Sequence, residues 1–200
     1  MGGQSARLDT LTPTERGVLE DASVMGRRGS GKALTRMVAT TRGDLDLPET
    51  LRTLRDKDLL FVDRDEWAFR SDLVRDVAYA RLTKTERARR HAGIAEYLVQ
   101  HGEGPRVDDT IAFHYRRAAE NARELGRVPG LPADIDERAV DWLCRATRGK
   151  PADAAIRLLG QAIALLPEDH PDRSTVLLDR AKLYASQHQL TSARRDLADA

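Results

Sequence analysis

The stretch LLFVDRDEWAFRSDLVRDVAYARL, residues 59–82, decides how the rest of this chain folds. Residues 59–63 are apolar and rich in residue types that favour β-strands. Arg64-Asp65 then form a polar break, and residues 66–70 alternate, with two aromatic side chains on one face. Two short strands around a polar break are typical of a β-hairpin. We therefore expect a hairpin in the first half of this stretch.

The second half of the stretch predicts a helix, because the period of its apolar residues changes after Asp72. They recur at helical spacing, at Leu73, Val74, Val77, Ala78 and Leu82. Ser71 stands where the side-chain oxygen of an N-cap residue belongs. We expect a helix that packs behind the hairpin.

Three further helices are expected before the hairpin. TPTE at residues 12–15 is a capping box with proline at the first helical position, and it opens a helix that runs to about Met25. A second helix is expected over residues 31–40. A third opens at Pro48, with leucines inward and basic side chains outward. Three helices followed by a hairpin and a helix are the order of a winged helix, which we assign to residues 10–82.

The rest of the chain has the pattern of helices. A second capping box, TKTE at residues 83–86, opens a helix that ends before Gly102, and GEGPR at residues 102–106 is a loop. We assign residues 83–107 to a linker helix and loop. Further helices, separated by glycine and proline, are expected over residues 109–125, 136–148, 152–166 and 172–188.

An internal similarity links two of the later segments. Ala155, Leu159 and Ala162 recur as Ala193, Leu197 and Ala200, a shift of 38 residues. This is close to the ~34 residues of a tetratricopeptide repeat. We assign residues 108–200 to a tetratricopeptide-like array, so the expected fold class is mainly α, a winged helix followed by an α-helical array. Because the last repeat stops partway through its second helix, we expect the array to continue in a longer protein.

Composition argues against several classes of protein. Charged residues make up 32% of the chain but nearly cancel to a net charge of +1, unlike a dedicated nucleic-acid binder. No apolar run approaches the ~18 residues of a membrane-spanning helix, and the N-terminus has no signal-peptide core. We therefore expect a cytoplasmic protein without a membrane partner. The single cysteine, Cys144, fits a buried thiol better than a catalytic one.

The sequence contains no clear catalytic or metal-binding motif. The histidines form no HExxH pair, and no serine lies in a GxSxG elbow. We expect no enzyme activity, no metal and no other cofactor. The larger aromatic residues are interpreted as core residues: Trp67, Phe69, Phe113, Tyr115 and Trp142.

GRRGSGK at residues 26–32 matches the spacing of a phosphate-binding loop. Such a loop follows a buried strand and ends in a serine or threonine that holds magnesium. Here the preceding residues have a helical pattern, and Ala33 stands at the hydroxyl position. We interpret these residues as a glycine-rich turn between two helices rather than as a nucleotide site.

FRSDLVRDVAYARL, followed by ERARRHAGIAEYL, resembles the winged-helix segment and the next helix of signal-transducing ATPases of the STAND class. The resemblance extends from about Leu11 to the C-terminus. Those bacterial regulators run from an ATPase core through a winged helix into helical repeats. The resemblance implies a non-catalytic segment that couples the ATPase core of a parent chain to the repeats, to a protein partner on them, and to an effector.

The resemblance also points to one site. In STAND proteins a histidine at the base of the wing helix, written Met-His-Asp or Arg-His-Ala, contacts the β-phosphate of ADP. Here the same place reads Arg70-Ser71-Asp72, so Arg70 and Ser71 would be a degenerate nucleotide-sensing position. The Ser71 hydroxyl is too short to replace an imidazole. It suits an N-cap that accepts the backbone N–H of Leu73 or Val74.

Two groups of basic residues could contact a nucleic acid or an acidic partner. They are Arg52, Arg55 and Lys57 on the expected third helix, and Arg81, Lys84, Arg87 and Arg90 further along. Asp56 and Asp58 interleave with the first group and would repel a phosphate backbone. DNA binding is therefore kept as the alternative, in the form of a winged-helix transcription regulator with a helical dimerisation region. A basic third helix and wing tip would favour that alternative, and a mixed surface would favour docking onto an ATPase.

Overall fold

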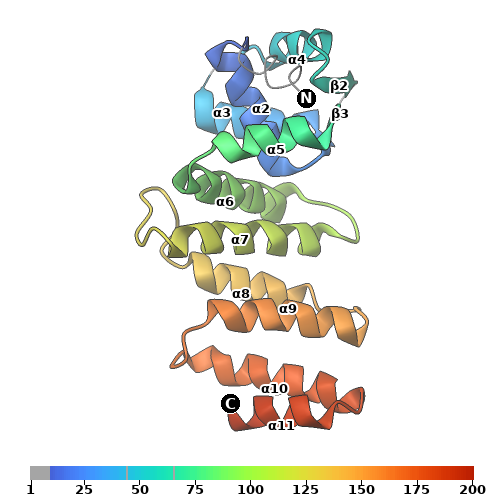
Figure 1. The fold of residues 1–200 in the computed structure, drawn as a ribbon, viewed down its shortest axis with the longest axis vertical. Coiled ribbons are helices and arrows are strands. Elements are labelled where there is room, and N and C mark those ends of the chain that lie inside the picture. Colours follow the sequence, from blue (N-terminus) through green and yellow to red (C-terminus); the bar gives the residue numbers. More distant parts are fainter. Residues whose placement is uncertain (1–9, 44, 65) are drawn as a thin grey trace. The chain divides into compact units, whose positions relative to one another are not determined.

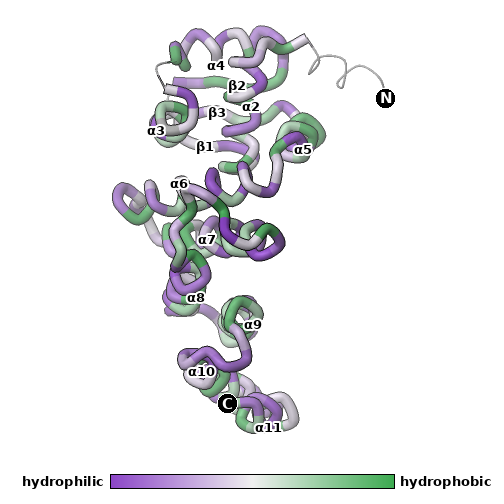
Figure 2. Tube along the Cα trace, turned by 90° about the vertical axis from the view of Figure 1, so that its left-hand side faces the viewer, coloured by the Kyte–Doolittle hydropathy of each residue, from purple (hydrophilic) through white to green (hydrophobic). Residues whose placement is uncertain are grey.

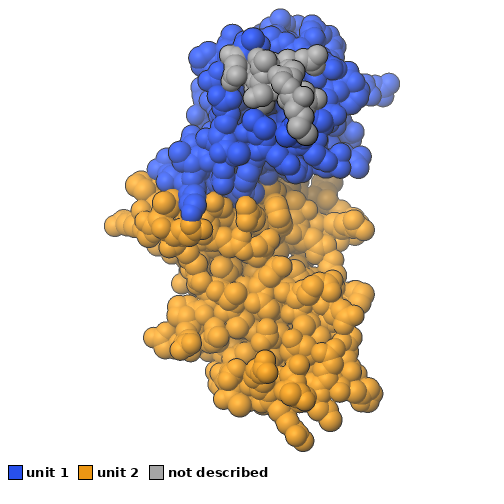
Figure 3. Space-filling model, viewed as in Figure 1, with its two compact units in different colours: residues 1–94 blue, residues 95–200 orange. Residues whose placement is uncertain are grey.

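The computed structural model describes residues 10–43, 45–64 and 66–200. The chain divides into two compact units, Met1–Ile94 and Ala95–Ala200, which Figure 3 colours separately. The boundary falls within helix α6 (Lys84–His101), inside the segment that the sequence assigns to a linker. The described residues are mainly helical and include one small antiparallel sheet, as the sequence predicts.

Unit 1 contains the helices and the hairpin that the sequence predicts, and one further strand. Its elements are α2 (Pro13–Met25), β1 (Arg28–Ser30), α3 (Gly31–Arg42), α4 (Leu47–Asp56), β2 (Leu60–Asp63), β3 (Glu66–Phe69), α5 (Asp72–Arg81) and the first part of α6 (Figure 1).

Both predicted capping boxes are confirmed. At the start of α2, the Thr12 hydroxyl accepts the backbone N–H of Glu15, and the Glu15 carboxylate accepts the backbone N–H of Thr12 at 2.8 Å. At the start of α6, Thr83 and Glu86 exchange the same two bonds. Each pair satisfies two of the backbone donors that the first turn of a helix leaves free.

The sheet is antiparallel with the strand order β1-β3-β2. The predicted hairpin is confirmed, with Leu60 opposite Phe69 and Asp63 opposite Glu66. Strand β1, which the sequence pattern did not predict, pairs with the other edge of β3 and places Gly29 opposite Trp67. The glycine-rich residues after α2 therefore extend the sheet instead of forming a simple turn.

The core of unit 1 lies between its helices and the hairpin. Its largest fully buried side chains include Leu19, Leu34, Leu54, Leu59, Leu60 and Trp67. The ring of Trp67 packs edge-on against Phe69, with ring centroids 5.7 Å apart. Full burial of each such side chain stabilises the fold by ~1.5–3 kcal/mol relative to exposure.

Unit 2 is a series of antiparallel helices that each pack against the next one along the chain (Figure 1). After the end of α6 they are α7 (Val107–Arg123), α8 (Ile135–Arg145), α9 (Ala152–Leu165), α10 (Pro171–Ser186) and α11 (Leu190–Ala198). In Figure 2, α8 and α10 lie on one side and α9 and α11 on the other. The helices predicted from the sequence are therefore present, with ends shifted by a few residues.

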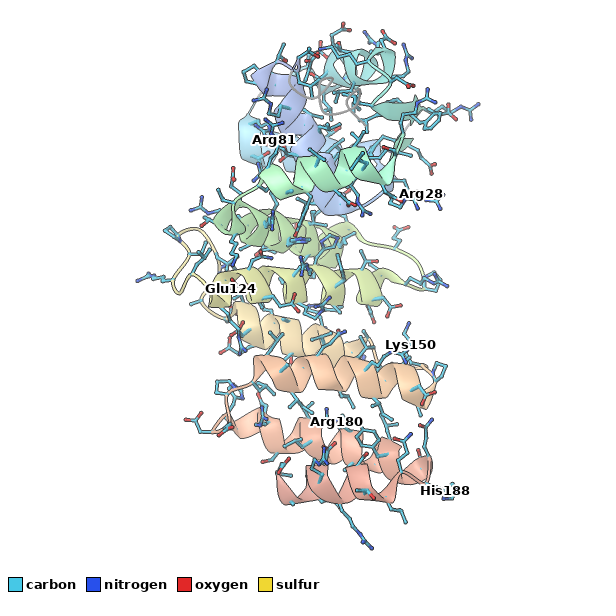
Figure 4. All side chains as sticks on the ribbon, viewed as in Figure 1. Arg28, Arg81, Glu124, Lys150, Arg180 and His188 are labelled. Atoms are coloured by element: carbon cyan, nitrogen blue, oxygen red, sulfur yellow. The ribbon has the colours of Figure 1, made fainter. Side chains whose placement is uncertain are left out.

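Small side chains and arginines hold the helices of unit 2 together. Fully buried alanines, such as Ala118 and Ala139, let neighbouring helices approach closely. Arg180 reaches from α10 toward α11 (Figure 4) and donates two hydrogen bonds of 2.7 Å to the carboxylate of Asp196, which is 2% exposed. Arg173 donates to the carbonyls of Ile163 and Leu166 at the end of α9.

The structure corrects two interpretations in unit 2. Phe113, interpreted as a core residue, is 46% exposed, because it lies on the side of α7 away from the buried Ile111 and Tyr115. The internal similarity is also incomplete in burial, since Leu159 is buried whereas Leu197 is 55% exposed. Within the described ranges, no helix combines the length and apolar character needed to cross a membrane.

Candidate functional site

Residues 26–32 do not have the geometry of a phosphate-binding loop. Strand β1 is extended along β3, and the carbonyl of Arg27 accepts the backbone N–H of Phe69 at 2.8 Å. A Cβ atom at Gly29 would lie 2.8 Å from Cζ2 of Trp67, closer than carbon atoms pack. Glycine at this position is explained by the buried indole beside it rather than by a bound phosphate.

Ser71 has the role predicted from the local sequence. Its backbone is extended, with φ −148° and ψ 152°, and its hydroxyl accepts the backbone N–H of Val74 at 3.3 Å. The preceding Arg70 pairs with Asp58 at 3.0 Å, and its guanidinium carbon lies 3.4 Å from the ring centroid of Phe61. Arg70 and Ser71, which the resemblance predicts to be a degenerate nucleotide-sensing position, therefore both have partners within unit 1.

The three basic side chains of the first group, on α4 and at its C-cap, each lie beside a carboxylate. Arg52 pairs with Glu49, Arg55 pairs with Asp56 at 3.0 Å, and Lys57 pairs with Glu15 at 2.7 Å. The acidic residues thus neutralise the three cations that could face a phosphate backbone.

The pairing of Lys57 also stabilises the charged form of Glu15. Burial of Glu15 opposes its ionisation, but hydrogen bonds from Lys57 and Thr12 outweigh that effect and hold the pKa of this carboxyl below its usual value. The ion pair therefore connects the end of α4 to the first turn of α2.

The second group of basic residues does not form one exposed patch. Arg81 and Lys84 are exposed, whereas Arg87 donates to the carbonyls of Tyr79 and Ala80 at the end of α5. Arg90 is only 9% exposed, so its assignment as an outward contact is wrong.

A buried carboxylate explains the position of Arg90. Asp21, which is 0% exposed, accepts hydrogen bonds from Arg90 Nε at 2.6 Å, Arg42 Nε at 2.9 Å and the Thr41 hydroxyl at 3.1 Å. These donors come from α6 and α3, so one side chain of α2 connects three helices. The sequence pattern did not reveal this cluster, although Asp21 lies between the apolar residues of α2. Burial also raises the pKa of the neighbouring Glu20.

Cys144 is only partly buried, whereas the sequence predicts a buried thiol, and two of the five histidines are buried. Burial raises the pKa of the Cys144 thiol to about 11, which disfavours the thiolate that a nucleophile needs. His91 is buried, with its Nε2 3.1 Å from the Tyr79 hydroxyl, and burial lowers the pKa of His114 to about 4. Among the described residues, no group of three or more histidine, cysteine, aspartate or glutamate side chains could hold a metal ion.

Unit 2 contains a groove of about 320 Å³ between α7 and α9. Its lining comprises Asp109, Ala112, Phe113, Arg116, Leu143, Lys150, Ala154, Arg157, Leu158 and Gln161. None of these residues except Phe113 was singled out from the sequence. The signal was present in the sequence, because the lining residues of each helix recur at the i, i+3, i+4, i+7 spacing of one helical face.

Comparison with known proteins adds no assignment. Family models, curated proteins and solved structures were each compared with the chain, and none of them matches it.

Proposed function

We propose that this chain is a non-catalytic segment of a STAND-class ATPase regulator, in which unit 1 is a winged helix and unit 2 begins a tetratricopeptide-like array. The order of three helices, a hairpin and a helix in unit 1 supports this assignment, as does the series of antiparallel helices in unit 2. In this proposal the segment couples the ATPase core of the parent chain to a protein partner on the repeats.

The observation that carries the proposal is the pairing of basic side chains along α4. A recognition helix that reads DNA offers uncompensated cations to phosphates and free side chains to base edges. Here the cations at Arg52, Arg55 and Lys57 each have a carboxylate partner. The wing tip reads Asp63-Arg64-Asp65, so its formal charge is negative. A mixed surface of this kind suits a protein partner better than a nucleic acid.

The way in which α6 joins the units also supports a coupling role. The helix begins in unit 1 and ends in unit 2, so helical residues connect the two. Its first half is attached to unit 1 through Arg90 and Asp21, and through Arg87 at the end of α5. A conformational change in α2 or at the end of α5 would therefore shift the first half of α6.

A DNA titration of the whole chain tests the proposal against the transcription-regulator alternative. Fluorescence anisotropy with a labelled duplex library should show only weak binding that disappears as salt rises to the physiological range, since the remaining contacts would be scattered phosphate contacts. Binding that survives at physiological salt and depends on sequence would favour the transcription regulator. A second check is the sequence encoded upstream, where the proposal requires a GxxxxGK[ST] loop preceded by a strand.

A further inference from the structure

The groove of unit 2 is built from two matching helical faces. Asp109, Ala112, Phe113 and Arg116 follow the i, i+3, i+4, i+7 spacing on α7, and Ala154, Arg157, Leu158 and Gln161 follow it on α9. Leu143 of α8, which is 1% exposed, also lines the groove. Two stripes that each combine two apolar and two polar or charged side chains therefore border the groove of about 320 Å³.

An aromatic ring of α7 is partly exposed at the groove. Phe113 is 46% exposed, and the guanidinium carbon of Arg116 lies 5.8 Å from its ring centroid. An exposed aromatic residue beside other apolar side chains is a common anchor point for a partner. The exposed part of the ring can therefore contact an apolar side chain in the groove.

Positive charge predominates along the lining. The lining includes three basic side chains, Arg116, Lys150 and Arg157, and one acidic side chain, Asp109. Lys150, in the loop that leads into α9 (Figure 4), pairs with Asp109 of α7. Arg116 shares the carboxylate of Glu120 with Arg117.

Arg157 differs from the other two cations of the groove. It is exposed, and no ion-pair partner for it occurs in the part of the chain that the structure describes. Its charge is therefore available to a carboxylate of a ligand.

We propose that this groove binds a short acidic segment of a partner protein that carries one apolar anchor side chain. The proposal rests on the proposed function, because it assigns the partner that the repeats would take. Each lining stripe covers seven residue steps of helix, ~10 Å, which matches about three residues of extended peptide. A carboxylate of such a segment complements Arg157, the cation of the lining without an ion-pair partner among the described residues, and its apolar side chain contacts Phe113 and Leu158.

The same lining is poorly suited to a nucleic acid. Proteins that bind single strands offer several aromatic faces for successive bases along a basic track. Here Phe113 is the only aromatic residue among the lining residues of the groove, and Asp109 and Gln161 interrupt the basic side chains. A peptide with alternating acidic and apolar character fits this pattern better.

Selection from a phage-displayed library of short random peptides against the whole chain tests the proposal. The expected consensus places aspartate or glutamate beside a single leucine, isoleucine or phenylalanine. The strongest selected peptide, labelled with fluorescein, should bind more weakly as salt rises, because charge pairs at an exposed groove are screened. A consensus that is basic or uncharged would overturn the proposal.

Variants with matched controls locate the binding. Arg157→Glu should weaken binding of the selected peptide at least ~tenfold, since it replaces attraction by repulsion. Arg194→Glu, at an exposed arginine of α11, should change the affinity by less than ~twofold. Phe113→Ala should weaken binding ~3- to 10-fold, whereas Phe61→Ala, at a phenylalanine of unit 1 that is 50% exposed, should not.

The outcomes separate this proposal from the function on which it rests. If Arg157→Glu and Phe113→Ala bind the peptide as the parent chain does, or if a single-stranded oligonucleotide binds the groove more tightly than the peptide, the groove proposal is wrong. Circular dichroism of the variants checks that they remain folded. Sequence-dependent DNA binding by the whole chain would instead contradict the proposed function, whatever the peptide does.

Discussion

Arg90 Nε lies 2.6 Å from Asp21 Oδ1, and both side chains are buried although they are 69 residues apart in the chain. Asp21 accepts two further hydrogen bonds from α3, at Thr41 and Arg42. Two buried charges are costly to remove from water, so a pair of this kind is stable only when its remaining hydrogen bonds are also made. The cluster therefore makes the positions of α2, α3 and the start of α6 depend on one another.

We predict that Asp21→Ala destabilises the chain by about 3–5 kcal/mol, because it removes the buried partner of Arg90 and leaves only the partly exposed Glu86, 3.6 Å away. Urea unfolding followed by circular dichroism measures the change. Asp56→Ala, which removes an exposed carboxylate paired with Arg55, is the control and should cost less than ~1 kcal/mol. A loss at Asp21 as small as that of the control would show that the cluster contributes little to stability.

Gly29→Ala should destabilise unit 1 by about 1–3 kcal/mol, since the added methyl group would lie 2.8 Å from Cζ2 of the buried Trp67. The matched control is Gly93→Ala, in the middle of α6, where a Cβ atom meets nothing within 4 Å. That substitution should stabilise the helix by ~0.5–1 kcal/mol. Thermal unfolding of the two variants should therefore shift in opposite directions. Equal shifts would mean that β1 does not pack against the indole.

Ser71→Ala should lower the free energy of unfolding by ~1 kcal/mol, because the hydroxyl that accepts the Val74 N–H is lost. Ser71→Asp retains a capping oxygen and adds a negative charge at the helix N-terminus, so it should retain most of the stability. Chemical denaturation of both variants tests the cap. If alanine and aspartate behave alike, the hydroxyl of Ser71 does not stabilise α5.

Features set by neighbouring residues were predictable from the sequence. Both capping boxes and the cap at Ser71 depend on residues within three positions, and they formed as expected. The hairpin was predictable because its two strands adjoin in sequence. Strand β1 was not predictable, since its Arg-Gly-Ser sequence has no β-branched or aromatic residue. It also pairs with a strand that is distant in sequence, with Arg28 opposite Ala68 and Ser30 opposite Glu66.

The candidate sites also depend on contacts between residues that are distant in sequence, and such contacts could not be predicted. The pairing of Asp21 with Arg90 joins residues 69 positions apart, and no local pattern specifies such a contact. The groove of unit 2 was partly predictable. Helical spacing predicts which residues share a face of α7 or α9, but it does not predict which helix each face packs against. Phe113 was misassigned for that reason, since hydrophobicity alone does not separate a core residue from a groove residue.

Stability should fall as the pH is lowered from about 7 to about 4, in part because of His114. Burial lowers the pKa of this histidine from 6.5 to about 4, so the unfolded chain takes up a proton in this range that the folded chain does not. The neutral His114 contributes fully to the free energy of unfolding at a pH above the pKa of histidine in the unfolded chain. This contribution is lost as the pH falls toward the pKa of His114 in the folded chain, and the loss reaches up to about 3 kcal/mol.

His114→Gln should therefore flatten the dependence of unfolding free energy on pH between about 7 and 5, whatever its effect on stability at neutral pH. His101→Gln, at an exposed histidine near the end of α6, is the control and should retain the slope of the parent chain. Urea unfolding at a series of pH values gives both slopes. An unchanged slope in His114→Gln would show that this histidine already gains its proton in the folded state.

The surface of α4 carries carboxylates that neutralise Arg52 and Arg55. The double variant Glu49→Gln and Asp56→Asn removes both carboxylate charges and leaves the two guanidinium groups uncompensated. Because each freed cation can neutralise one phosphate, the affinity for duplex DNA should rise at low salt. The slope of log K against log salt should steepen by up to ~1.8, or ~0.9 for each new phosphate contact.

The control for net charge is the double variant Glu103→Gln and Glu168→Gln, which removes two exposed carboxylates from unit 2. It changes the total charge equally but leaves α4 as it is, so its DNA affinity should rise much less. Anisotropy titrations at several salt concentrations compare the two variants with the parent chain. If both variants gain affinity equally, long-range charge rather than the pairing along α4 limits DNA binding. If neither variant gains affinity for DNA, the α4 surface cannot approach a duplex even when its arginines have no carboxylate partner. The shape of this surface, and not its charge, would then distinguish α4 from a helix that reads DNA.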